Sequence, residues 1–121
     1  MKRHILAAMF VGGLAATPAL AQNDGQTAFN TSCRTCHTMK EGDNRLGPNL
    51  AGIVGRKAGS LPDYNYSSSM KQSGITWDAA TLDQFIANPD QVVSGNNMKP
   101  YGGITDAAQR KTLVDFLQSG G

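Results

Sequence analysis

Residues 32–39 read SCRTCHTM and place two thiols and one imidazole within five consecutive positions. Cys33 and Cys36 are the only two cysteines of the chain, and His37 directly follows the second. Thiols and an imidazole at this spacing suit four kinds of site: a structural disulfide, a dithiol redox pair, a zinc site, or the attachment point of a covalent haem.

Three of these interpretations leave part of the pattern unexplained. A disulfide between Cys33 and Cys36 closes a very short loop and gives His37 no role. A thioredoxin-like pair normally opens a helix after a strand, and no strand pattern precedes it here. A structural zinc site takes four ligands, so carboxylates would have to complete the set.

The fourth interpretation uses all three residues, because C-x-x-C-H is the attachment signature of c-type haem. Residues three apart on a helix share a face, so both sulfurs can reach the two vinyl groups along one haem edge. His37 is the next residue of the chain, and its ring can lie under the iron as the proximal ligand. We therefore predict one covalently bound haem c, with its iron, held by Cys33, Cys36 and His37.

The first 21 residues have the layout of a secretory signal peptide. MKRH is a short basic start, ILAAMFVGGLAA is an apolar run, and Ala19 and Ala21 are the small residues before a cleavage site. The apolar run is shorter than the about 20 residues that span a bilayer. We predict a cleaved signal peptide over residues 1–21, a single domain over residues 22–121, no membrane anchor and a location in the periplasm, where haem attachment takes place.

Removal of this leader would leave a nearly neutral chain. Lys2 and Arg3 leave with it, so the 11 basic residues become 9, against 9 acidic residues. There is no basic stripe and no basic run longer than two residues, which argues against a nucleic-acid partner. His4 also leaves, so His37 is the only histidine of the mature chain.

The second axial ligand of a haem iron must come from elsewhere in the chain. Without a second histidine, a thioether is the remaining common ligand. Met39 follows His37 too closely to reach the opposite haem face, and Met70 lies in a serine-rich stretch. Met98 lies in NNMKPYGG, where proline and glycines can hold one side chain rigidly inward. We predict Met98 as the ligand, against the alternative that it only fills the core.

Helices joined by long ordered loops must position these residues. Turn signals fill residues 39–65 and 94–103, and no period-two pattern indicates a strand. The expected helices are GQTAFNTSC after an N-cap at Asp24, Ser67 to Ser73, Asp78 to Ala87 after a cap at Thr76, and a last helix from Thr105 or Asp106 to near Ser119. A domain of about 100 residues has a marginal core, which a cofactor would complete.

Two longer stretches resemble class I cytochrome c, of the small soluble mitochondrial and bacterial c2 type. RLGPNLAGIVGRKAG is similar to its proximal loop, and GITWDAATLDQFIANPDQVVSGNNMKPYGGI to its distal half. The resemblance runs from about Gly25 to Leu117. It implies an all-α cytochrome c fold, with four to five helices and long loops around one haem. It also implies crossed first and last helices, with Phe29 packed against Leu113 and Phe116.

The resemblance assigns roles to four further residues. Pro48 of LGPN would accept a hydrogen bond from the ligating histidine, which fixes the ring and makes the ligand more basic. Arg56, Tyr66 and Trp77 match residues that satisfy the haem propionates. Buried propionates need such donors or countercharge, because they have left water.

The sequence departs from the family pattern inside the haem pocket. Phe85 stands in place of a tyrosine that donates to the methionine sulfur in many members, and Met70 in place of an interior asparagine. One residue is missing between His37 and Pro48, and one is added after Met98. The tyrosine donor is therefore absent, and Met70 is expected near the haem but not on the iron.

The lysines that ring the haem edge in mitochondrial members are largely replaced. Asp90, Gln91 and Asn97 stand at three such places. The cations that can still form a weaker patch are Lys40, Arg56, Lys57, Lys71 and Lys99. We therefore expect no strong basic docking face.

These observations predict an exported electron carrier and not an enzyme. The iron would cycle between Fe(II) and Fe(III) with His37 and Met98 as ligands, and the thioether favours the ferrous state. The expected partners of this monomer are respiratory-chain redox proteins, met transiently: a membrane oxidase, a bc1-type complex, or a periplasmic dehydrogenase or reductase. The alternatives are a haem peroxidase, which needs distal acid-base groups, and a haem redox subunit of a dehydrogenase or oxidase complex.

Overall fold

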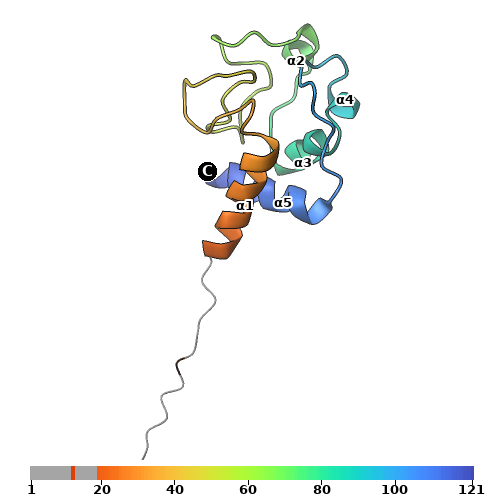
Figure 1. The fold of residues 1–121 in the computed structure, drawn as a ribbon. Coiled ribbons are helices and arrows are strands. Elements are labelled where there is room, and N and C mark those ends of the chain that lie inside the picture. The colour runs from red at the N-terminus through yellow and green to blue at the C-terminus, as the bar shows by residue number, and fades with distance from the viewer. Residues whose placement is uncertain (1–11, 13–18) are drawn as a thin grey trace, which may run out of the picture.

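Five α-helices and long loops make up the part of the chain that the computed structural model describes, residue 12 and residues 19–121 (Figure 1). The helices are α1 (Ala19–Ser32), α2 (Ser68–Gln72), α3 (Ala79–Ala87), α4 (Pro89–Val92) and α5 (Ala107–Ser119). Within this part there is no strand, and the one β-bridge is an isolated antiparallel pair of Lys57 and Thr76. The predicted all-α class with long loops is confirmed. The proposed leader, residues 1–21, lies outside the described residues except for residue 12 and its last three.

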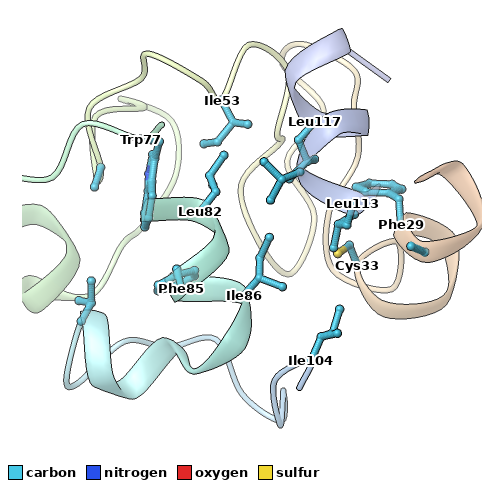
Figure 2. Packing of buried hydrophobic residues seen from close by; sticks show 14 residues of the cluster. Phe29, Cys33, Ile53, Trp77, Leu82, Phe85, Ile86, Ile104, Leu113 and Leu117 are labelled. Atoms are coloured by element: carbon cyan, nitrogen blue, oxygen red, sulfur yellow. The ribbon is translucent and has the colours of Figure 1, made fainter. Parts of the chain in front are cut away.

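The first and last helices, α1 and α5, cross and pack against each other (Figure 1). The ring centroids of Phe29 and Phe116 are 5.5 Å apart, and Leu113 is completely buried beside Phe29 (Figure 2). The packing expected at this crossing is therefore confirmed. The predicted N-cap at Asp24 is wrong, because α1 begins at Ala19 and Asp24 lies inside it. The preceding Ala-Leu-Ala sequence favours helix strongly and extends it towards the N-terminus.

Gly25 lies at the contact between these helices. A methyl group there would stand 2.7 Å from Phe116 Cβ and 3.1 Å from the carbonyl oxygen of Thr112. Both atoms are fixed to the backbone of α5, so the helices must move apart to accept it. Glycine within a helix costs about 0.5–1 kcal/mol relative to alanine, but overpacking costs about 1–3 kcal/mol.

We therefore expect Gly25→Ala to lower the free energy of unfolding by about 1–2 kcal/mol, because overpacking exceeds the gain in helix propensity. Denaturant unfolding of the purified protein measures this change. Gly102→Ala is the control, since its methyl group would meet nothing within 4 Å and the residue has no positive φ. A Gly25→Ala protein as stable as the control would show that the helices do not need this close approach.

The helix α3 differs from expectation at its N-cap, and the segment that follows it forms a further short helix. Its N-cap is Asp78 and not Thr76: the Asp78 carboxylate accepts from Thr81 N, and Thr81 Oγ1 accepts from Asp78 N, each at 2.8 Å. This reciprocal capping box satisfies two backbone donors, whereas Thr76 pairs with Lys57. The short helix α4 was not expected. Asn88 ends α3 in extended conformation, and Pro89 then occupies the first turn of α4, where its missing N–H costs nothing.

The ends of α2 and α5 lie close to those expected from the sequence. Ser67 caps α2 by accepting from Met70 N, and Gly74 follows this helix with a φ of 70°. Asp106, one of two candidates, caps α5 by accepting from Ala108 N. Gly120 ends α5 in the left-handed conformation.

The buried side chains form one cluster that includes a thiol (Figure 2). Cys33 lies near Phe29 and Leu113, while Trp77 packs edge-on against Phe85 at 5.0 Å elsewhere in the cluster. Its members are Ala28, Phe29, Cys33, Ile53, Ala58, Trp77, Leu82, Phe85, Ile86, Val93, Ile104, Leu113, Val114 and Leu117. Among the described residues, no helix has both the length and the apolar character that a membrane span needs.

Candidate functional site

The two cysteines and the histidine lie on a turn that continues the hydrogen bonding of α1. The N–H of Cys33 donates to Phe29 O at 2.8 Å, and that of His37 donates to Cys33 O at 2.9 Å. Both bonds join residues four apart, as in an α-helix. The α1 helix ends at Ser32, but this turn keeps a helical arrangement as far as His37. Cys33 is buried, Cys36 is half-buried, and both thiols are free.

This environment argues against a redox dithiol and a zinc site. Burial, with a smaller contribution from Cys36, raises the pKa of the Cys33 thiol to about 11. A redox-active pair instead needs a thiol whose pKa is lowered. In the described part of the chain, no group of three or more His, Cys, Asp or Glu side chains is arranged to hold a metal ion.

His37 is fixed by the carbonyl group of Pro48. Its Nδ1 lies 2.7 Å from Pro48 O, and the residue is only 7% exposed. A carbonyl oxygen only accepts, so Nδ1 carries the proton and Nε2 keeps a free lone pair. Burial lowers the pKa of His37, against the smaller opposite effect of the bond to Pro48. The ring is therefore held in the neutral form that binds metals.

Gly47 covers the His37 ring with bare backbone. A methyl group on Gly47 would lie 2.7 Å from Nδ1 and 3.0 Å from Nε2 of that ring. The N–H of Gly47 donates to Cys36 O at 2.7 Å, which holds the loop against the cysteine turn. Sequence reasoning did not single out Gly47, although it belongs to the LGPN motif.

Backbone pairing brings Arg56 and Trp77 together. The N–H of Gly55 donates to Trp77 O at 2.7 Å, and that of Trp77 donates to Arg56 O at 2.9 Å. The Trp77 side chain is buried, but its indole N–H donates to no acceptor among the described residues. Every side-chain nitrogen or oxygen of these residues that is fully enclosed has a hydrogen-bond partner. Because the indole N–H has none, it must be accessible from outside the protein. It is free to donate to a further acceptor.

The Arg56 guanidinium is directed mainly towards the proximal loop. It donates to Asn49 O at 2.7 Å and to Ala51 O. Burial lowers the pKa of Arg56, and the nearby Tyr66 opposes this shift. Tyr66 packs edge-on against Tyr64, with ring centroids 4.8 Å apart. Arg56 thus lies next to both Tyr66 and Trp77, and their role towards a propionate stays a prediction.

All three methionines of the predicted mature chain are partly buried against the core. Met39 lies beside Gly121, at the end of α5. The backbone of Met70 belongs to α2, and its carbonyl accepts from Ser73. The backbone N–H of Met98 donates to the side chain of Asn96 at 2.9 Å. Ligation by Met98 stays a prediction.

These donors fit a covalently attached haem. Two thiols on one turn can form thioethers, a fixed neutral imidazole offers Nε2 to iron, and an indole N–H is free for a carboxylate. The small cluster of apolar side chains supplies the apolar surface that a porphyrin needs. The disulfide, dithiol and zinc interpretations explain none of the residues beyond the cysteine turn.

Comparisons with known proteins agree with this assignment. The profile of the cytochrome c family matches residues 22–121. A cytochrome c of Cochliobolus lunatus is 40% identical over 95 residues, 78% of this chain and 87% of that protein. Cytochrome c2 iso-1 of Magnetospirillum fulvum is 39% identical over 97 residues, 79% of this chain and 97% of that protein.

A solved structure supports the same fold. Cytochrome cH from Methylobacterium extorquens superimposes with a TM-score of 0.74 at 36% identity, covering 81% of this chain and 97% of that one. The residues that match the family, 22–121, include the cysteine turn, the proximal loop and the distal half of the chain. This chain therefore belongs to the class I cytochromes c, electron-transfer proteins that bind one covalent haem c with its iron.

Proposed function

We propose that this chain is an exported one-electron carrier in which His37 and Met98 are the axial ligands of the haem iron. The observation that carries the proposal is the His37 ring, whose Nδ1 is fixed by Pro48 at 2.7 Å while Nε2 stays free. When bound, the haem supplies an iron that alternates between ferrous and ferric states. Cys33 and Cys36 would hold its edge, and the Trp77 N–H and Arg56 would stabilise its propionates.

The distal side of the proposed site favours a carrier over a peroxidase. Peroxide chemistry needs an open iron and a distal acid-base group. His37 is the only histidine after the proposed leader, and it belongs to the proximal side. Phe85, at the position of a tyrosine in many relatives, is buried against Trp77 and offers no proton. A thioether from Met98 would close the iron and require little rearrangement when an electron moves.

Export rests on the proposed leader. Its basic start, apolar run and small residues at Ala19 and Ala21 support cleavage after Ala21. We place the mature chain, residues 22–121, in the periplasm. A membrane oxidase, a bc1-type complex and a periplasmic dehydrogenase or reductase are partners of suitable chemistry.

The cations available for docking are fewer than the sequence suggested. Lys99 donates to both carboxylate oxygens of Asp90 at 2.8 Å, and Arg56 is directed to the proximal loop. Lys40, Lys57 and Lys71 are exposed and form no ion pair within the described residues. We propose small, transient complexes that depend only weakly on ionic strength.

The absorption and electron paramagnetic resonance spectra of the purified ferric protein test the proposal. We expect six-coordinate low-spin iron that binds hydrogen peroxide and cyanide slowly, because Met98 must first leave. A high-spin iron that reacts with peroxide at once would instead support the peroxidase. Reversible one-electron reduction, followed by potentiometric titration, checks that the protein cycles between the two states.

A further inference from the structure

The segment that carries Met98, residues 94–104 and here called the Met98 loop, is attached to the protein on both sides of the methionine. After Met98, the Tyr101 hydroxyl donates to Ile86 O at 2.6 Å, and the N–H of Ile104 donates to the same oxygen at 3.1 Å. These bonds connect the loop to the last turn of α3. Before Met98, the attachment is made by one residue, Asn96, whose backbone N–H donates to Val93 O at 3.2 Å and whose side chain makes three further bonds.

Asn96 is one of the few buried polar side chains, with 5% of its surface exposed. Its Nδ2 donates to Val93 O at 2.9 Å and to the Asp90 carboxylate at 3.0 Å. Its Oδ1 accepts from the backbone N–H of Met98 at 2.9 Å. One amide therefore joins α4 directly to the residue that we propose as the iron ligand.

Asp90 fixes the other end of this connection. The carboxylate belongs to the first turn of α4 and also accepts from Lys99 Nζ at 2.8 Å. The side chains of Lys99 and Asp90 are 59% and 56% exposed, so water screens their ion pair and it contributes little. The bond from Asn96 to Asp90 is different, because its donor is a buried amide that loses one of its two acceptors if Asp90 is removed and then keeps only Val93 O.

We propose that Asn96, anchored by Asp90, is a positioning residue that holds the Met98 thioether on the iron. The inference rests on the proposed ligation by Met98. Without the Asn96 side chain, the Met98 N–H loses a buried acceptor that is supplied within its own loop. The loop then opens more often, and the iron is exposed for a larger fraction of the time.

Imidazole titration of the ferric holoprotein at one fixed pH measures this opening. Imidazole binds the iron only when Met98 has left, so its apparent affinity rises in proportion to the open fraction. We expect Asn96→Ala to bind imidazole about tenfold more tightly than the wild type, the effect of losing about one buried hydrogen bond. In the absence of imidazole this variant should stay low-spin. Asn97→Ala is the matched control, because Asn97 is exposed and its side chain has no partner among the described residues.

A second pair of variants keeps the test valid if Asn96→Ala does not fold. Asp90→Ala and Lys99→Ala both remove the ion pair, but only Asp90→Ala removes the anchor of Asn96. We expect imidazole affinity to rise about threefold in Asp90→Ala and to stay within about 1.5-fold of wild type in Lys99→Ala, since exposed pairs contribute little.

The results for these variants distinguish the positioning role of Asn96 from the ligation of the iron by Met98. Equal affinities in Asn96→Ala and Asn97→Ala, or in Asp90→Ala and Lys99→Ala, would overturn the positioning role while leaving ligation by Met98 intact. A Met98→Ala protein with an unchanged ferric spectrum would overturn the ligation itself, and with it the role of Asn96.

Discussion

Replacing Met98 by alanine is expected to convert the ferric iron from low spin to high spin. The variant should also lower the midpoint potential by a few tenths of a volt, because axial ligands set haem potentials over a range of about 0.8 V. The physical reason is that a thioether favours ferrous iron, whereas the water that replaces it favours the ferric state. Visible absorption and electron paramagnetic resonance report the spin state, and potentiometric titration gives the midpoint potential.

Met70→Ala is the matched control for this variant. Met70 is partly buried against the same core, but its backbone belongs to α2, and we expect it to pack near the haem without ligating. Its replacement should lower the free energy of unfolding, since a methionine that fills the core is lost, while the low-spin spectrum is retained. If Met98→Ala stayed low-spin and Met70→Ala became high-spin, Met70 would be the ligand.

Replacing both Cys33 and Cys36 by serine is expected to abolish covalent attachment of the haem. Serine is close to cysteine in size, but its hydroxyl does not replace the thiol that forms a thioether. The haem retained after denaturation and extraction with acidified organic solvent measures attachment. We expect full retention in the wild type, none in the double variant and reduced yields in each single variant.

The same double variant should lose much of its helix content. The apolar cluster of the described residues is small and includes Cys33 itself, so a domain of about 100 residues depends on the haem to complete its core. Far-ultraviolet circular dichroism measures the helix content. A double variant that lacks haem but unfolds as cooperatively as the wild type would show that the side chains suffice.

Local chemistry made part of the fold predictable from the sequence. Asp106 caps α5 as expected, Gly74 follows α2 and Gly120 ends α5, because each of these effects depends on a few neighbouring residues. The cap of α3 was misassigned because Thr76 and Asp78 are both suitable residues. Pairing with Thr81 favours Asp78, whereas Thr76 pairs with Lys57. The start of α1 was placed too late, since a good cap at Asp24 does not stop a helix whose preceding residues also favour it.

The cysteine turn was equally predictable, because its chemistry lies within five residues. Apart from the contact of His37 with Pro48, the surroundings of the proposed ligands could not be predicted from the sequence. The contact of Gly47 with His37, the bonds of Arg56 to the proximal loop and the connection from Asp90 through Asn96 to Met98 each depend on how distant segments meet. In the sequence, Asp90 was notable only because it replaces a lysine of the docking face. In the structure, its carboxylate also accepts a hydrogen bond from the buried side chain of Asn96.

The most direct test is the intact mass of the protein purified from the exported fraction and measured under denaturing conditions. We predict the mass of residues 22–121 plus one haem, with the haem on the peptide that contains Cys33 and Cys36. The mass of the bare polypeptide, with both thiols free or joined to each other, would contradict it.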